Sequence, residues 1–187
     1  MSTLPRFDSS GVNLLISPTF ALQKLTEQKL DDAQALNLLG LLLERLGHYE
    51  RAVEALAGAV LALEAQVEEG RIADENVLKQ RMAMVHANLG RTLCASGNFQ
   101  DAITHYENAL EHGGAGSSRV YCLLGAGIAY YFEDKLQESL EMFETALNET
   151  ESDIDLRMDV TVLLSKVLWA LGGDEQRNVA KSQMLSR

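Results

Sequence analysis

The chain contains little proline and little cysteine, and both shortages limit what it can be. Only two of its 187 residues are proline, Pro5 and Pro18, and only two are cysteine, Cys94 and Cys122. Because proline breaks helices, residues 19–187 are free to be helical throughout. The cysteines form no Cys-x-x-Cys pair, so we expect neither a disulfide framework nor a zinc site. Free thiols of this kind are typical of the cytoplasm or the nucleus.

Long hydrophobic runs and clusters of basic residues are also missing. The apolar stretch LNLLGLLLERL is interrupted by Glu44 and Arg45 after too few residues to cross a membrane. The chain has 16 Lys and Arg against 27 Asp and Glu, a net charge of −11. Phosphate contacts need clustered Lys and Arg, so we expect no direct nucleic-acid binding and no membrane partner.

Acidic residues gather in one part of the sequence. Residues 133–159 contain ten Asp or Glu residues and only two basic ones, Lys135 and Arg157. Such a run has two interpretations: a solvated helix face with its adjoining loop, or an acidic patch for a basic partner.

The residue patterns of enzymes are absent as well. The four histidines, at positions 48, 86, 105 and 112, have no second His or Cys at metal-ligand spacing. The glycine-rich run 113–116 lacks the Lys-Ser/Thr ending of a phosphate loop. No nucleophile, base and orienting group can be assembled. We therefore predict a protein without catalytic residues, metal or cofactor.

An internal repeat is the main feature that the sequence does contain. Three glycines (Gly40, Gly90, Gly127) are each followed by a small residue twelve positions later (Ala52, Ala102, Ser139) and by an alanine nineteen positions later (Ala59, Ala109, Ala146). Apolar residues recur around them at helical spacing. Glycine in a helix costs about 1 kcal/mol relative to alanine, so these glycines need a packing reason. We predict that they let two helices approach closely, with Gly40 facing Ala52.

These spaced small residues resemble the tetratricopeptide repeat, a helix-turn-helix unit of about 34 residues. The resemblance implies an all-α solenoid of stacked antiparallel helix hairpins, with about eight helices. It divides the chain into a disordered tail (1–12), a single superhelix (13–187), repeats at about 33–66, 74–113 and 118–150, and a partial copy at 153–187. A further helix is expected at 18–29, with Ser17 as its cap.

The spacing between the first two repeats is longer than the family pattern. Gly40 and Gly90 are 50 residues apart, whereas Gly90 and Gly127 are 37 apart. The extra residues keep an apolar helical period except near Gly70 and Asp74. We predict two lengthened helices, with Gly70 ending the first and Asp74 capping the second.

The resemblance also implies a partner-binding groove lined by the first helix of each repeat. The expected groove residues are Asn37, Leu41, Glu44, Met84, Asn88, Arg91, Tyr121, Leu124, Ile128 and Tyr131. For Leu41, Leu124 and Ile128 the alternative is burial by neighbouring helices. Tyr121, Tyr131 and Arg91 are the stronger candidates, because aromatic and arginine side chains dominate interface energies.

Three segments, LNLLGLLLERLGHYERAVEALAGAVLALE, ANLGRTLCASGNFQDAITHYENALE and VTVLLSKVLWALGG, occur in an order similar to repeats of the fungal superkiller complex scaffold family. That resemblance implies a cytoplasmic scaffold for an RNA helicase and a WD40 propeller subunit in exosome-linked mRNA decay. It also implies a fragment with exposed solenoid ends that can self-associate. The alternative is a free-standing adaptor or co-chaperone that holds a peptide or amphipathic helix of a protein partner.

Overall fold

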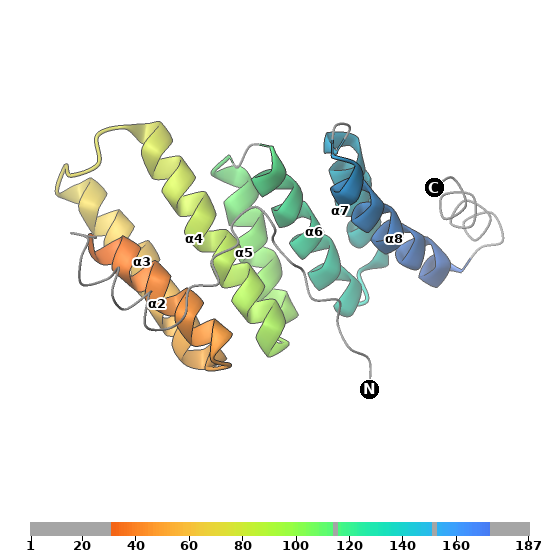
Figure 1. The fold of residues 1–187 in the computed structure, drawn as a ribbon, viewed down its shortest axis with the longest axis horizontal. Helices are drawn as coiled ribbons and strands as arrows, with labels where there is room; N and C mark the ends of the chain where they lie inside the picture. Colours follow the sequence, from red (N-terminus) through yellow and green to blue (C-terminus); the bar gives the residue numbers. More distant parts are fainter. Residues whose placement is uncertain (1–30, 114–115, 151–152, 173–187) are drawn as a thin grey trace.

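A row of helical hairpins makes up the protein, as the computed structural model shows (Figure 1). The structure describes residues 31–113, 116–150 and 153–172. Their helices are α2 (Asp32–Arg45), α3 (Tyr49–Glu68), α4 (Glu75–Ser96), α5 (Phe99–Glu111), α6 (Ser117–Phe132), α7 (Leu136–Glu149) and α8 (Ile154–Leu171). The all-α solenoid is therefore confirmed, with seven helices where about eight were expected. The predicted tail 1–12, the helix at 18–29 and residues 173–187 lie outside the described residues.

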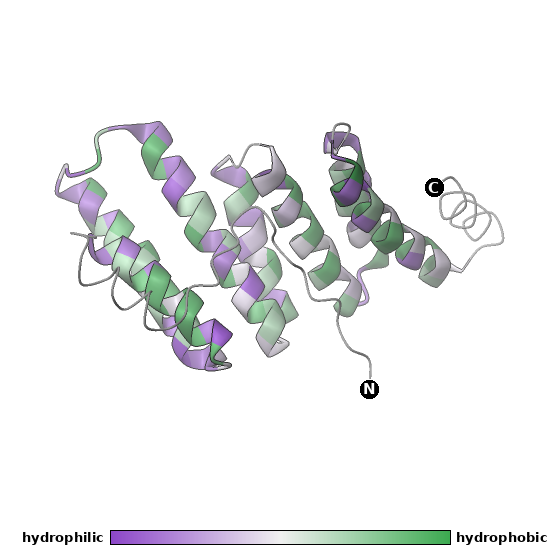
Figure 2. Cartoon of the chain, viewed as in Figure 1, coloured by the Kyte–Doolittle hydropathy of each residue, from purple (hydrophilic) through white to green (hydrophobic). Residues whose placement is uncertain are grey.

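The helices pack as antiparallel neighbours in chain order, from α2 against α3 through to α7 against α8. Hydrophobic and hydrophilic residues alternate along the helices (Figure 2), and most of the buried side chains are apolar. The core is a chain of clusters rather than one centre, because each hairpin contacts only its neighbours.

The repeated glycines lie where an inner helix meets the outer helix of its own hairpin. A Cβ atom on Gly40 would collide with Leu56 and would lie 3.2 Å from the Ala52 carbonyl oxygen. Side chains sixteen residues after each glycine (Leu56, Tyr106, Phe143) fill the space that the missing Cβ leaves. The spacing of the small residues did not indicate these three large residues. The expected approach of Gly40 to Ala52 is confirmed.

The small residues of the repeat are buried between the helices. Ala52, Ala59, Ala102, Ala109, Ser139 and Ala146 all belong to the buried interior. Ser139 stands where the other repeats have alanine, and its hydroxyl donates a hydrogen bond to the Gly127 carbonyl oxygen at 2.7 Å. Serine can therefore replace alanine at this buried position, because its hydroxyl is hydrogen-bonded.

The long spacing between the first two repeats is explained by helix length. With 20 and 22 residues, α3 and α4 are longer than α5 and α7, which have 13 and 14. Gly70 follows α3 in a left-handed conformation, with φ of 67°. The Asp74 carboxylate accepts from the backbone N–H groups of Asn76 and Val77 and caps α4. Both predicted boundaries are confirmed.

Candidate partner-binding groove

The inner face of the solenoid is formed by the first helix of each hairpin. The backbones of α2, α4, α6 and α8 approach one another in succession, whereas among the described residues α3, α5 and α7 make no such contacts with one another. The stack is therefore more closely spaced on the side of α2, α4, α6 and α8. The expected groove residues all belong to α2, α4 and α6.

Four of the expected groove residues bind one another across α2 and α4. The Asn88 side-chain amide donates to the Asn37 carbonyl oxygen at 2.9 Å. Arg91 donates to the Glu44 carboxylate at 2.8 Å and pairs with its second oxygen at 2.7 Å. Burial raises the pKa of Glu44, and the charge of Arg91 opposes that shift. These contacts connect two repeats.

Asn37 is only 6% exposed, so its expected place on the binding surface is corrected. A buried amide needs hydrogen-bond partners, and Asn88 supplies one. The role of Asn37 is to connect α2 and α4 from within.

A second ion pair secures the lengthened hairpin to α2. Arg81 of α4 donates to both carboxylate oxygens of Asp31 at 2.7 Å and to the Gln66 side chain at 3.1 Å. The pKa of Asp31 is lowered: burial pushes it upward, but hydrogen bonds from the Gln34 backbone and from Arg81 outweigh that effect. Arg81 thus holds the start of α2 against the extra turns of α3 and α4.

The remaining groove residues divide by exposure. Met84 is 48% exposed, Tyr121 41% and Tyr131 38%, so a partner can reach all three. Arg91 is also exposed, while Leu41 and Ile128 are half-buried. Leu124 is 1% exposed and belongs to the core cluster around Phe143, so its expected place in the groove is wrong. The family resemblance placed it in the groove, three positions before Gly127, with burial as the alternative. Burial is what the structure has, because the same core cluster includes Leu156, Val160 and Leu164 of α8.

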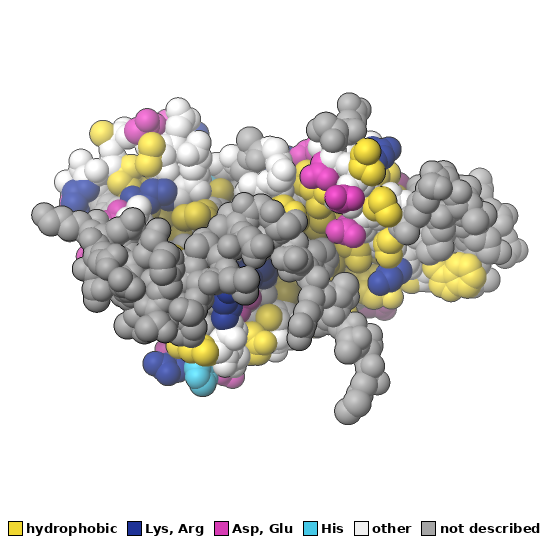
Figure 3. Space-filling view, viewed as in Figure 1, with side chains coloured by type: hydrophobic (Ala, Val, Ile, Leu, Met, Phe, Trp, Pro, Cys, Tyr) yellow, Lys and Arg dark blue, Asp and Glu magenta, His cyan; other side chains and the backbone are white. Residues whose placement is uncertain are grey.

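Two further groups of side chains lie near the expected groove residues: a mixed group over α8 and an aromatic group at the end of α6. Over α8, hydrophobic, acidic and basic side chains lie side by side (Figure 3). Phe99 and Phe132 stack with ring centroids 4.6 Å apart, and the Tyr131 ring meets Phe132 edge-on at 5.8 Å. This aromatic group could not be predicted from the repeat pattern, because its members come from different repeats.

Three histidines that are scattered in the sequence lie together in the structure. The Nδ1 atoms of His86 and His105 are 3.0 Å apart, and the rings of His86 and His112 stack at 5.8 Å. The spacing of His105 and His112, seven residues on one helix, was the available signal that they share a face. Within residues 31–113, 116–150 and 153–172, no group of three or more His, Cys, Asp or Glu residues is arranged to hold a metal ion.

The described part of the chain has no helix with the length and apolar character needed to cross a membrane.

Two family models match the chain, and both describe the tetratricopeptide repeat. One matches residues 81–148 and the other residues 33–62. Together they cover the three hairpins that the glycine spacing indicated.

Three curated relatives are similar over most of the chain. Superkiller protein 3 of Schizosaccharomyces pombe is 30% identical over 174 residues, which is 90% of this chain and 12% of the relative. Tetratricopeptide repeat protein 37 of Xenopus laevis is 27% identical over 87% of this chain and 9% of its own length. Superkiller protein 3 of Saccharomyces cerevisiae is 26% identical over 95% of this chain and 12% of its own length. The chain thus spans about a tenth of the length of each relative.

Solved structures share the fold at low sequence identity. BtubC from P. vanneervenii superposes with a TM-score of 0.66 at 22% identity, over 90% of this chain and 72% of that one. A kinesin light chain-like repeat protein from Podosopora anserina gives 0.65 at 18% identity, over 89% of this chain and 79% of that one. At these identities the likeness shows the architecture alone.

Proposed function

Because this chain belongs to the tetratricopeptide repeat family, we propose that it is one section of a long protein-interaction scaffold and that its inner face holds a partner protein. The repeats and the relatives support an interaction scaffold in general. The more specific role follows from the similarity to Superkiller protein 3, which extends over nine-tenths of the chain. On that basis the section works in the cytoplasm, where it helps to hold an RNA helicase and a WD40 propeller subunit for mRNA decay.

The observation that carries the proposal is the set of exposed contact residues on consecutive inner helices. Met84 and Arg91 on α4 and Tyr121 and Tyr131 on α6 are solvent-accessible. Large apolar and arginine side chains that stay exposed on a rigid scaffold are typical of binding hot spots. The sequence patterns indicate no constellation of nucleophile and base, so the role we propose is non-catalytic.

The alternative function is a separate adaptor that holds a short peptide or an amphipathic helix in the same groove. An adaptor would bind its partner through the same groove residues, so only the identity of the partner distinguishes the two functions. The relatives are about ten times longer than this chain, which favours a section of a large scaffold.

Binding of purified partners by this chain and its variants tests the proposal. We expect the wild-type chain to bind a superkiller helicase or propeller subunit. The double substitution Tyr121→Ala, Tyr131→Ala should weaken binding by roughly a hundredfold, since each hot-spot truncation costs about 1–2 kcal/mol.

The matched control replaces two exposed outer residues of α7, Gln137→Ala and Glu144→Ala, and should leave the affinity unchanged. Circular dichroism verifies that every variant stays helical. Binding only to a short peptide of a chaperone would support the adaptor instead. If the tyrosine variant and the control bound the partner equally well, the partner would not bind at the inner face.

A further inference from the structure

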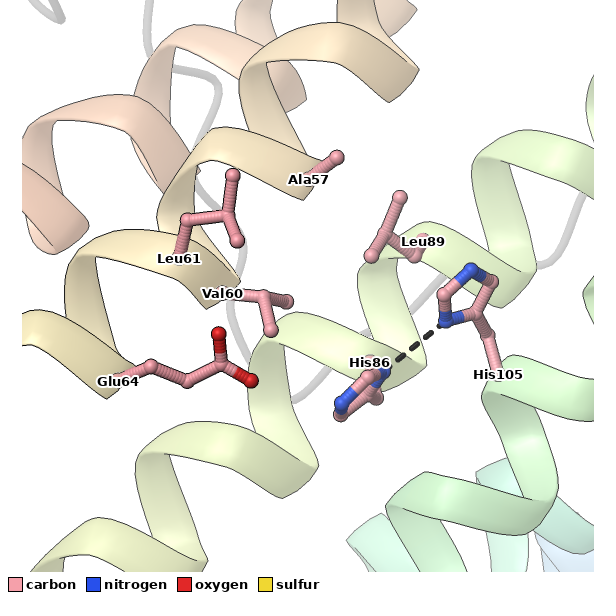
Figure 4. A pocket seen from close by; sticks show the side chains of 7 residues that line it. All are labelled: Ala57, Val60, Leu61, Glu64, His86, Leu89 and His105. Atoms are coloured by element: carbon pink, nitrogen blue, oxygen red, sulfur yellow. Dashed lines mark hydrogen bonds between the residues drawn. The ribbon is translucent and has the colours of Figure 1, made fainter.

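The outer side of the solenoid has a hollow of its own between α3 and α5 (Figure 4). It measures about 260 Å³ and is lined by Ala57, Val60, Leu61, Glu64, His86, Leu89 and His105. The residues of α3 form one wall, His105 of α5 the other, and His86 and Leu89 of α4 the floor. The hollow exists because α3 and α5 both pack on α4 without contacting each other.

Most of the atoms that line the hollow are apolar, yet one large apolar side chain is left in solvent. Leu61 is 65% exposed at the rim, and Ala57 one turn earlier is exposed as well. A leucine side chain gains substantially from burial, so this position favours contact with another apolar group.

The floor of the hollow is uncharged at neutral pH. His86 is buried, and burial together with the charges of His105 and His112 lowers its pKa to about 4. Burial also lowers the pKa of His105, although Asp101 opposes this shift. Two neutral imidazoles with Nδ1 atoms 3.0 Å apart can share one hydrogen bond, one ring donating and the other accepting.

The two helices that form the walls of the hollow, α3 and α5, are acidic: they contain seven Asp or Glu residues and one basic residue. The outer helices α3, α5 and α7 contain eleven Asp or Glu residues and one basic residue, Arg51. The inner helices α2, α4, α6 and α8 contain five acidic and seven basic residues. On α3, Glu54 and Glu64 lie exposed on the same helical stripe as Leu61, one on each side of it. The exposed leucine therefore lies between carboxylates, with no Lys or Arg on that stripe.

We propose that this outer hollow is a docking site for a basic segment of a protein partner. The segment places one apolar side chain beside Leu61 and its lysine or arginine side chains against Glu54 and Glu64. Charge complementarity selects this occupant, because an acidic segment would be repelled by Glu54 and Glu64 beside Leu61. The site goes beyond the proposed function, because it uses the outer face and none of the groove residues.

Fluorescence anisotropy with a short labelled peptide tests the proposal. The probe has leucine on one helical face and Lys and Arg on the other, and a second probe has serine in place of leucine. We expect the leucine peptide to bind at physiological salt. Glu54→Lys with Glu64→Lys, or Leu61→Ser alone, should each weaken its binding by roughly tenfold.

Two control variants decide where the peptide binds. Glu138→Lys with Glu144→Lys makes the same charge change on the outer face of α7, away from the hollow, and should change the affinity by less than about threefold. The groove variant Tyr121→Ala, Tyr131→Ala should bind the peptide as the wild type does.

Three outcomes would overturn the docking site. They are an absence of peptide binding, equal binding of the serine probe, and equal losses from the α3 and α7 charge reversals. If only the groove variant lost binding, the peptide would bind at the inner face instead. It would end this proposal and leave the proposed function standing.

Discussion

The inner and outer helices share one packing pattern but differ in charge. Both sets supply the small and apolar residues that the repeat requires, for example Gly90 on α4 and Ala102 on α5. Yet the inner helices have slightly more basic than acidic residues, and the outer helices are almost entirely acidic. The repeat fold fixes the buried positions and leaves the exposed ones free. The fold therefore does not require the charge difference between the two sets.

The two sets also differ in how they are connected. Inner helices of successive repeats contact one another through polar pairs such as Asn37 with Asn88 and Arg91 with Glu44. In the described part of the chain, the backbones of the outer helices approach inner helices and not one another, which leaves a hollow between α3 and α5. The inner face is therefore linked from α2 to α4 by side-chain contacts, whereas the outer face has a separate hollow between α3 and α5.

The largest effect should come from breaking the contact between an inner and an outer helix. In Gly127→Val, the new Cβ would lie 2.6 Å from the Phe143 ring, which is buried and unable to move aside. We expect a loss of more than about 3 kcal/mol in the free energy of unfolding, measured by urea denaturation at 222 nm.

Gly58→Ala on α3 provides the control for that substitution. Its Cβ would meet Leu36 at an ordinary 3.4 Å, and alanine has the better helix propensity. We expect an unchanged or slightly higher stability. If both variants lost the same free energy, close packing would not be the reason for Gly127.

The second largest effect should be a pH dependence of stability that arises from the histidine cluster between the inner helix α4 and the outer helix α5. The pKa of His86 is about 4 in the folded protein, against about 6.5 for an unperturbed histidine. The unfolded chain therefore binds more protons at this position, so the stability that the neutral His86 contributes is lost as pH drops from about 6.5 to about 4. His86 alone should account for up to about 3 kcal/mol of that loss.

Urea denaturation across this pH range measures the effect. The groups that face His86 are Glu64 of α3 and His105 and His112 of α5. His86→Phe should flatten the acid side of the stability curve, whereas His48→Gln, in the exposed turn before α3, should leave it unchanged. An unchanged curve for the phenylalanine variant would contradict a buried neutral His86.

Periodicity predicted the faces of the helices and most of their ends. Gly70 could be predicted as the end of one helix and Asp74 as the cap of the next, because helix termination and capping depend on local chemistry. The turn of the third repeat kept its left-handed geometry without glycine: Asp134 has φ of 59°, close to the 79° and 84° of Gly47 and Gly97. Aspartate tolerates this region better than most residues, so its presence did not disturb the prediction.

Contacts between repeats could not be predicted in the same way. A helical stripe shows that Leu124 lies near Tyr121, but it does not show how far α8 extends over α6. The histidine cluster combines His86 of α4 with His105 in the middle of α5 and His112 just after its end. The pairing of Asn37 with Asn88 spans 51 residues. Such contacts depend on the rotation between successive hairpins, which side-chain volumes across the whole stack determine.

The smallest effect on the free energy of unfolding should come from Ser139, the polar residue among the repeated small ones. Ser139→Ala removes the 2.7 Å hydrogen bond to the Gly127 carbonyl oxygen. Alanine fits this place, because Ala52 and Ala102 occupy it in the other repeats. We expect a loss of about 1 kcal/mol by urea denaturation, the net value of one buried hydrogen bond.

The reverse substitution, Ala102→Ser, makes the comparison between repeats complete. A serine there would have the Gly90 carbonyl available at the equivalent position, so its hydroxyl could be satisfied and the stability should change by less than about 0.5 kcal/mol. A large loss from Ala102→Ser, beside a small one from Ser139→Ala, would mean that the third hairpin is spaced to hold a hydroxyl. The third repeat would then differ from the second in geometry, rather than only in the side chain between its helices.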